Sequence, residues 1–328
     1  MPTDPAYRAA DPDDFPAMIE PGRYARRSSD FEEIIARTEE HFWNPEDPDY
    51  VDFAAPFPTD QDTIVPTWFV LESNTAVWDR LDEGQRIRLT NQSARWSLSN
   101  ILHGEQGALS LSASLCDIFL DPGAQEYAAN QAREEARHVH AFTKYMAARF
   151  GGAVFPVGDT VGSLLKELVA TPVVYKKIVG MQMLVEGVAM GAFTTLYKIA
   201  QDPLLRRVCQ LVMTDEAFHH KFGKIWAHAT IPQLDAAERD AVLEARTDAH
   251  RRSLMQRGSN VFRTLIKTLL KAGIITERTR AAYAAWVDLD ELEAEGDRMV
   301  GDEVAEEGIK SLKAINAGKR KVVRRLGA

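Results

Sequence analysis

The feature that most constrains the fold of this chain is a polar unit that occurs twice. Each copy consists of a glutamate, an Asp-Pro pair and an E-x-x-H motif, in the pattern E-x15-D-P-x12-E-x-x-H. The first copy is Glu105, Asp121-Pro122, Glu135 and His138, and the second, shifted by 81 residues, is Glu186, Asp202-Pro203, Glu216 and His219. One E-x-x-H motif is a weak signal in a chain with eight histidines. Two copies in the same register indicate two units that fold alike.

Each copy of the unit predicts a hairpin of two helices. From about residue 75 onward, proline becomes scarce and apolar residues recur at intervals of three and four, which is the helical period. Aspartate is a favoured N-cap and proline is favoured at the first helical position, so each Asp-Pro pair is expected to end one helix and begin the next. We expect long helices at about 93–120, 122–150, 173–200 and 203–230, a shorter one at about 161–170, and further helical patterns at 235–257, 259–271 and 276–316.

The spacing within each hairpin places its acidic residues at one depth. The 16 residues from Glu105 to Asp121 span about 24 Å of helix, and the 13 from Pro122 to Glu135 span about 20 Å. Glu135 and His138 are three residues apart and share one helix face. If the two hairpins face each other, four carboxylates and two imidazoles meet at one level inside a four-helix bundle.

A bundle interior does not tolerate four unpaired carboxylates, because burying isolated charges is very costly. Two divalent cations would neutralise them, and a set of carboxylates and imidazoles suits iron or manganese better than the softer metals. A solvated, charged helix face is the alternative reading, and it accounts for Arg133, Glu134 and Arg137. It does not account for Glu186, which lies in the apolar run GMQMLVEGVAMGAF.

Two further acids adjoin the proposed ligands. Glu134 precedes Glu135, and Asp215 precedes Glu216. Each is expected to accept the N–H of a metal-bound histidine from the opposing hairpin, which would orient the ring and raise its basicity. As a hypothesis, Glu186 and Glu216 are the carboxylates that shift between terminal and bridging positions.

Apolar residues one or two turns from the ligands are candidates for a substrate pocket, with ordinary core packing as the alternative. These residues are Leu109, Phe142, Met183, Met190 and Phe193.

The duplicated residues resemble the ligand set of the ferritin-like di-iron carboxylate superfamily, over about residues 93–230. In that superfamily two helices of the bundle contribute one Glu each, and the other two contribute Glu-x-x-His. The resemblance implies an all-α, ferritin-like four-helix bundle with additional flanking helices. It also implies a centre of two iron ions, with manganese as an alternative at one position, and use of O₂.

The chain departs from several members of the superfamily at single positions. Ribonucleotide reductase small subunits carry a radical tyrosine where this chain has Phe142. Ligand-binding oxidases carry their cross-linked Val and Tyr where it has Leu109 and Met181. Multicomponent monooxygenase hydroxylases carry a Thr where it has Met190. Arylamine N-oxygenases share the Asp-Glu-x-x-His-His run, but they carry a further histidine where this chain has Val212.

The resemblance therefore favours an O₂-activating non-haem di-iron oxygenase or oxidase of monooxygenase type that acts on a small organic substrate, by hydroxylation or N-oxygenation. Desaturation and C–C cleavage stay open. The alternatives are a radical-bearing subunit like that of ribonucleotide reductase, a ligand-binding oxidase, or a non-catalytic iron-binding relative of ferritin. Such an oxygenase implies an electron donor, either a reductase or a ferredoxin. The long flanks on either side of the bundle suggest an enclosed pocket and the surface of a homodimer.

The remainder of the sequence sets the context. Residues 1–75 are rich in Pro and Asp and predict a loop-rich wrap with one short helix near 31–41, followed by the helical domain at 76–328. The net charge of −9 argues against nucleic acid as the main partner. No stretch approaches 18 apolar residues and no secretory signal is present, so we expect a cytoplasmic protein without a membrane span. The two cysteines fit a reducing compartment.

Overall fold

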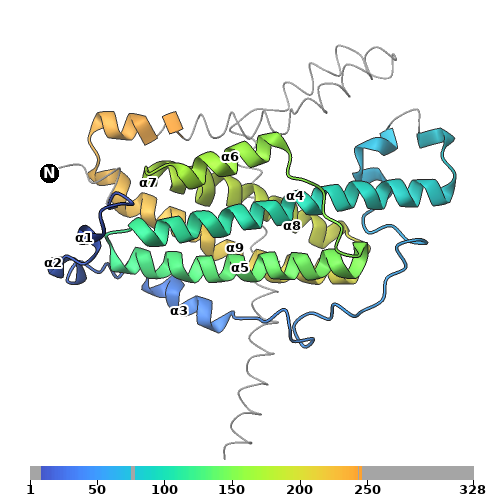
Figure 1. Ribbon diagram of the computed structural model, residues 1–328, viewed down its shortest axis with the longest axis horizontal. Helices are drawn as coiled ribbons and strands as arrows, with labels where there is room; N and C mark the ends of the chain where they lie inside the picture. Colours follow the sequence, from blue (N-terminus) through green and yellow to red (C-terminus); the bar gives the residue numbers. More distant parts are fainter. Residues whose placement is uncertain (1–8, 75–77, 243, 246–328) are drawn as a thin grey trace, which may run out of the picture.

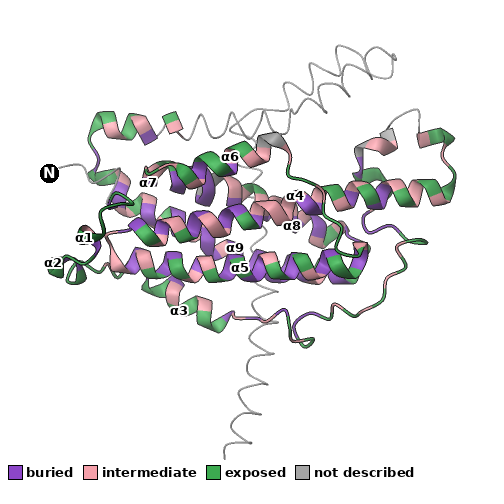
Figure 2. Cartoon of the chain, viewed as in Figure 1, coloured by how far each residue is buried: buried purple, intermediate pink, exposed green. Residues whose placement is uncertain are grey.

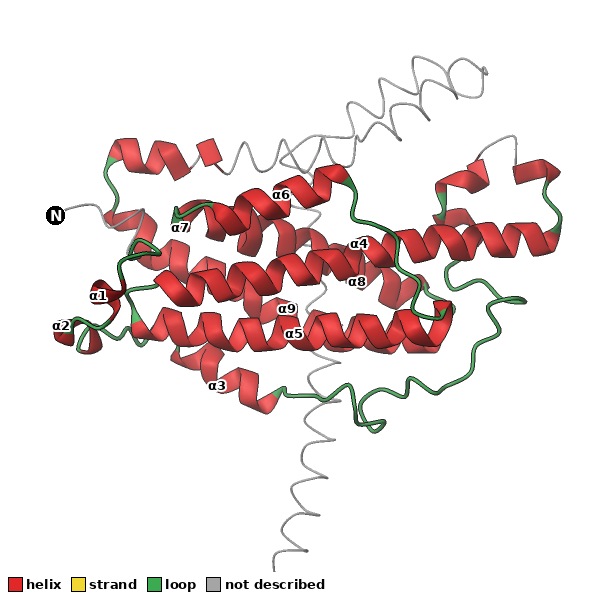
Figure 3. Cartoon of the chain, viewed as in Figure 1, coloured by secondary structure: helices red, strands yellow, loops and turns green. Residues whose placement is uncertain are grey.

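The computed structural model describes residues 9–74, 78–242 and 244–245, and within these residues the chain is helical, with a single isolated β-bridge between Ala9 and Phe119 and no strand (Figures 1 and 3). A bundle of four long helical segments forms the body. Its segments are α4 (Glu83–Ile118), α5 (Pro122–Phe150), the continuous run of α7 (Val174–Lys177), η4 (Ile178–Val185) and α8 (Glu186–Ile199), and α9 (Pro203–Thr230). The all-α class expected from the duplicated unit is confirmed. Most of the helical patterns expected beyond residue 235 lie outside the described residues.

The two Asp-Pro pairs form the hairpin turns as expected. Asp121 caps α5 by accepting a hydrogen bond from Gly123 N over 2.8 Å, and Asp202 caps α9 by accepting one from Leu204 N over 3.0 Å. The first helix begins at Glu83 rather than near residue 93, because Asp82 and Gln85 form a capping box ten residues earlier. At the far end of α5, the chain leaves the helix at Gly151, whose φ of 60° lies in the left-handed region that favours glycine.

The third segment of the bundle is not a uniform α-helix. Between α7 and α8, residues 178–185 form π-helical turns that end directly before Glu186. Such turns are rare and occur frequently at functional sites. The segment Val174–Ile199 is also long and apolar enough, with a mean hydropathy of 1.3, to meet the composition test for a membrane span, which the sequence was not expected to contain. In this structure 56% of its apolar window is buried, and core helices of bundles meet the same test.

The remaining helices cover the bundle. The N-terminal region contributes α1 (Phe15–Met18), α2 (Pro21–Tyr24) and α3 (Glu32–Glu40), of which α3 lies along α5 and α9. Three 3₁₀ turns follow, at Thr67–Phe69 (η1), Leu71–Asn74 (η2) and Trp78–Arg80 (η3), and a fourth, η5 (Ile231–Gln233), follows α9. On the other side, α6 (Asp159–Ala170) crosses α4 (Figure 1).

Apolar side chains form two clusters along the bundle axis, and the buried residues run as stripes on the inner faces of the long helices (Figure 2). The first cluster contains residues before Glu105 and after His138, such as Leu98 and Phe142. The second contains residues after Glu105 and before Glu135, such as Leu111 and Tyr127. The duplicated glutamates and histidines therefore lie between two apolar ends.

The duplication allows a matched test of stability at the two hairpin turns. Asp202 not only caps α9 but also accepts hydrogen bonds from Arg149 Nε over 2.6 Å and from the Tyr145 hydroxyl over 2.9 Å, all buried. Asp202→Ala leaves the Arg149 guanidinium buried without its carboxylate and is expected to cost about 3–5 kcal/mol of unfolding free energy. Asp121→Ala, at the same place in the first hairpin, removes the helix cap and a hydrogen bond that Ser28 N donates over 3.0 Å, and should cost about 1–2 kcal/mol. Urea denaturation measures both, and equal losses would contradict this account.

Candidate metal centre

The four glutamates and two histidines of the duplicated unit meet in the interior of the bundle. They form two groups of four, each with three carboxylates and one imidazole, in which the possible ligand atoms all lie within 4.8 Å of one another. One group is Glu105, Glu135, His138 and Glu216, and the other is Glu135, Glu186, Glu216 and His219. All six side chains are at most 5% exposed. The register of the repeat therefore brings together every residue that the sequence analysis selected as a ligand.

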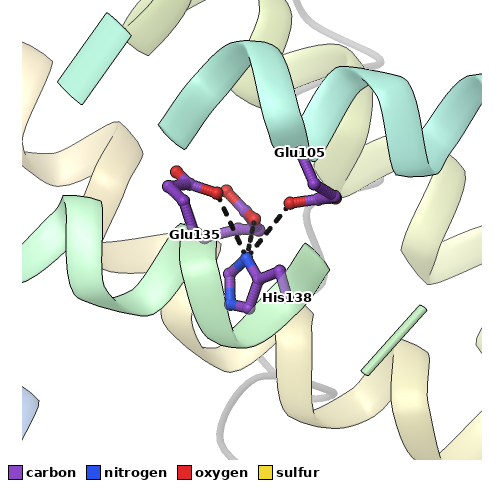
Figure 4. Close-up of side chains that lie close together, drawn as sticks. Glu105, Glu135 and His138 are labelled. Carbon is purple, nitrogen blue, oxygen red and sulfur yellow. Dashed lines mark hydrogen bonds and ion pairs between the residues drawn. The ribbon is translucent and has the colours of Figure 1, made fainter. Parts of the chain in front are cut away.

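The half of the cluster around His138 is drawn in Figure 4. The Nδ1 atom of His138 lies 3.1 Å from Glu105 Oε2, 3.3 Å from Glu135 Oε2 and 3.1 Å from Glu216 Oε1. These carboxylates come from α4, α5 and α9, so three helices direct an oxygen at one ring nitrogen.

The half around His219 repeats this arrangement. Its Nδ1 atom lies 3.0 Å from Glu135 Oε1 and 3.0 Å from Glu216 Oε2, and Glu186 completes the group. Glu135 and Glu216 thus direct one oxygen to each half, whereas Glu186 belongs to the His219 half alone. The hypothesis that paired Glu186 with Glu216 as bridging carboxylates differs from this geometry, in which the spanning partner of Glu216 is Glu135.

Each histidine ring is held from behind by an acid of the opposing hairpin. His138 Nε2 lies 3.0 Å from Asp215 Oδ2, and His219 Nε2 lies 3.0 Å from Glu134 Oε2. An ionised carboxylate accepts hydrogen bonds and donates none, so each Nε2 carries the proton. In the neutral ring, the lone pair of Nδ1 then faces the glutamates, which is the tautomer that binds a metal there.

Asp215 has two partners that the sequence analysis did not identify. Its Oδ2 atom accepts a hydrogen bond from Trp43 Nε1 over 2.8 Å and one from Arg137 Nη2 over 2.7 Å. Trp43 also stacks on His138, with 6.3 Å between ring centroids and 15° between planes. Burial alone would raise the pKa of Asp215, but Arg137 and His138 outweigh it and lower this pKa to about 2. The alternative reading of a solvated helix face does not fit Glu134 and Arg137, which are buried, whereas Arg133 is exposed.

Why Trp43 was missed is clear from its position. It follows α3 in a Pro- and Asp-rich loop, where no helical period indicates which side chains face the bundle. Two buried glutamines, Gln131 and Gln182, were also missed, although each lies four residues before a glutamate of the cluster, on the same helix face.

The buried cluster holds protons when no cation is present. Burial raises the pKa of Glu105 to about 8 and raises that of Glu186 well above its ordinary value. Burial would lower the pKa of both imidazoles, but hydrogen bonds and charges of the surrounding carboxylates outweigh it, so the pKa values of His138 and His219 lie well above the ordinary value. At neutral pH, protons on these carboxyl groups and imidazoles offset the negative charge of the cluster, as bound cations would.

Two divalent cations fit the donor set better than protons do. Glu135 Oε2 and Glu216 Oε1 are buried and accept no hydrogen bond from any described residue, and both point toward the His138 half. Two cations would supply four positive charges to the four glutamates, and a ligand set of oxygens and imidazole nitrogens suits iron or manganese.

The candidate pocket residues differ in how far they are buried. Phe142 and Phe193 are buried and stack on each other, with ring centroids 5.8 Å apart, and Met190 is buried as well. Leu109 is half-buried, and the side chain of Met183 is outside the described residues. A hollow of about 290 Å³ lies elsewhere, between α3 and α5, and none of these five residues lines it.

Comparison with known proteins gives one match. The model of the family described as p-aminobenzoate N-oxygenase AurF matches residues 26–257, which is more than half of the 328-residue chain. No curated protein and no solved structure matches the chain.

The protonation of the cluster leads to a prediction for metal binding. Cations bind the deprotonated ligands, and the pKa values of Glu105, Glu186 and both histidines are raised, so binding must displace protons. The apparent affinity for Mn(II) should therefore increase as the pH rises through neutrality toward about 8. Calorimetric titration of metal-free protein in two buffers of different ionisation enthalpy measures the protons released. Identical heats in the two buffers would contradict the prediction.

Proposed function

The chain belongs to the family of the p-aminobenzoate N-oxygenase AurF, a family of ferritin-like di-iron oxygenases, and on this premise we propose that it transfers oxygen from O₂ to the amino nitrogen of a small aromatic amine. Family membership makes the chain a non-haem di-iron oxidoreductase. It favours the oxygenase reading over a ribonucleotide reductase subunit or a ferritin relative. The observation that carries the proposal is the match across residues 26–257 combined with a buried cluster of two groups of three carboxylates and one imidazole.

In this proposal the six clustered residues are the iron ligands. Glu135 and Glu216, which each direct one oxygen toward each histidine, would contribute to both iron positions. Glu105 and His138 would hold one ion, and Glu186 and His219 would hold the other. The distances of 3.0–3.3 Å between each Nδ1 and its surrounding oxygens support this division. Glu134 and Asp215 support it from outside, because each fixes the tautomer of one histidine.

The reaction sets what the protein must provide. Oxygenation of an amine to a hydroxylamine consumes one O₂, two electrons and two protons, and releases one water. The iron pair, when bound, supplies the reduction and activation of O₂. The electrons must come from outside the substrate, which is why we include a reductase or ferredoxin as the partner. The protein's own residues orient the ligands, exclude water and hold protons near the cluster.

The apolar end beyond His138 is the proposed place for the body of the substrate. Phe142 and Phe193 stack there and are 0% and 1% exposed, with Met190 on the same helix as Phe193. An aromatic ring can pack against such faces, and apolar side chains that exclude water strengthen the charge interactions beside them. Leu109 is a less direct candidate because it is half-buried.

The assembly and location are also proposals. We propose a homodimer in the cytoplasm, supported by the long segments that flank the bundle core and by two cysteines, Cys116 and Cys209, that are both free thiols.

Isotope transfer tests the reaction. Iron-loaded protein, chemically reduced and exposed to ¹⁸O₂ with a panel of aromatic amines, should yield hydroxylamine or more oxidised nitrogen products that contain ¹⁸O. The matched panel of the same rings without the amino group should remain unoxidised. Mass spectrometry reads both. Oxygen on a ring carbon, with the amine intact, would overturn N-oxygenation while leaving the oxygenase class.

Ligand variants test the division of roles. Glu105→Ala and Glu186→Ala each remove a carboxylate that belongs to one half, so iron binding should fall from two ions per chain toward one. Glu216→Ala removes the oxygens that face both histidines, so it should abolish tight binding at both positions. Iron content after gel filtration measures this, with Glu126→Ala, on the outer face of α5, as the control. Two ions retained in either single-half variant would refute the ligand assignment.

A further inference from the structure

Two glutamines occupy the bundle interior beside the His219 half of the cluster. Gln131 lies on α5 and Gln182 lies in the π-helical segment η4, and both are 0% exposed. Neither is a residue of the duplicated unit. Buried amides of this kind are retained where their hydrogen bonds are made, because an unsatisfied buried polar group is costly.

The contacts of Gln131 determine which way its amide points. Its terminal nitrogen lies 3.0 Å from Glu135 Oε1 and 3.3 Å from Glu186 Oε1. Both partners are carboxylate oxygens of the proposed ligand set. A carboxylate that binds a cation is ionised and only accepts hydrogen bonds, so the side that faces them must be the NH₂ group. The carbonyl oxygen of Gln131 is then turned toward Gln182, whose Nε2 donates to it over 2.9 Å. The two amides thus form a chain that ends on two glutamates.

The nitrogen of Gln131 also lies 3.3 Å from Gln182 Oε1, and both of its hydrogen bonds to glutamates fall on the same half of the cluster. Glu135 Oε1 is the oxygen that faces His219, at 3.0 Å, whereas Oε2 of the same residue faces His138. Glu186 belongs to the His219 group alone. Gln131 therefore fixes the carboxylates of one metal position and reaches none of the oxygens that face the other.

The backbone behind Gln182 is fixed as well. The carbonyl oxygen of Gln182 accepts a hydrogen bond from His220 Nδ1 over 3.0 Å, which ties η4 to α9. His220 directly follows His219, so the helix that supplies one ligand also anchors the segment that carries the amide chain.

The internal repeat provides the comparison. A shift of 81 residues takes Gln131 to Val212, and the reverse shift takes Gln182 to Ile101. Val212 is fully buried in the apolar cluster on the His138 side, and Ile101 packs against that cluster. The positions that correspond to the two amides of the His219 half are therefore apolar in the His138 half, to which Glu105 belongs.

We propose that Gln131, oriented by Gln182, is a positioning residue that fixes Glu186 as a terminal ligand of the His219 position and so makes the two metal positions unequal. The His219 position holds its metal in a fixed coordination. The His138 position has no such restraint, and Glu105 is the carboxylate that is free to change its binding mode. The proposal rests on the ligand set given under Proposed function.

Single-position variants separate the two halves. His138→Ala leaves the His219 position, and His219→Ala leaves the His138 position. Cobalt(II) titration followed by visible absorption measures the affinity of each without turnover. Gln131→Met, which keeps the length of the side chain and removes the amide, should lower cobalt affinity roughly 10–100-fold in the His138→Ala background, the range found for groups that orient metal ligands. In the His219→Ala background the change should be smaller than about threefold.

Two further variants complete the test. Val212→Met, the residue 81 positions later, should leave the affinity in the His138→Ala background unchanged. Gln182→Met, which acts only through Gln131, should weaken the same half by less than Gln131→Met does. In the unaltered ligand set, Gln131→Met should change one of the two Mössbauer doublets of the di-ferrous protein and leave the other.

The outcomes distinguish the amide chain from the ligand set. If the protein with all six ligands binds fewer than two cobalt ions, the ligand set is wrong and this proposal falls with it. If two ions bind but Gln131→Met weakens both halves equally, or neither, the ligand set stands and the proposed role of Gln131 is wrong. Circular dichroism confirms that each variant is folded before its titration is interpreted.

Discussion

The burial of four carboxylates within a few ångströms of one another is the constraint on which the rest of this structure depends. Glu105, Glu135, Glu186 and Glu216 are each at most 5% exposed, in a bundle whose two ends are apolar. Water cannot screen their repulsion there, so the fold requires positive charge at the centre, from protons or from metal. The raised pKa values of Glu105 and Glu186 show the cost of keeping these carboxylates ionised without a cation, and two divalent cations would remove it.

The surrounding structure keeps this centre oriented and dry. Asp215 and Glu134 fix the histidine tautomers, and Trp43 and Arg137 in turn hold Asp215. Trp43 comes from the N-terminal region, so the loops before the bundle contribute directly to the environment of His138.

The repeat in the sequence predicted the features that depend on helical periodicity. The two Asp-Pro turns, the common depth of the glutamates and the gathering of all six clustered residues follow from spacing alone, because a helix advances by a fixed amount per residue. The features that were missed depend on tertiary contacts. The π-helical turns before Glu186 change the helix locally, and the single glycine within them, Gly180, does not distinguish a π-helical turn from an α-helix. Trp43 lies in a loop without a period. The alternative of a solvated helix face covered Arg137, because a charged residue on a helix gives no indication that α9 supplies a buried partner.

The carboxylates that face both histidines also depend on tertiary contacts that helical spacing does not predict. The repeat in the sequence predicts two equivalent hairpins. In the structure, however, Glu135 and Glu216 each direct one oxygen to His138 and the other to His219, whereas Glu105 and Glu186 do not. Glu135 and Glu216 are thus common to both halves of the centre, whereas Glu105 and Glu186 each belong to one half. The amide chain of Gln131 and Gln182 makes the halves differ further, because it contacts only the His219 half.

The most direct test of the account is anomalous diffraction at the iron absorption edge from crystals of the iron-loaded protein. We expect two peaks. One should lie between His138 Nδ1 and the carboxylates of Glu105, Glu135 and Glu216, and the other between His219 Nδ1 and the carboxylates of Glu135, Glu186 and Glu216. A single peak, or iron bound away from these six side chains, would contradict the claim that the duplicated unit builds a two-iron centre.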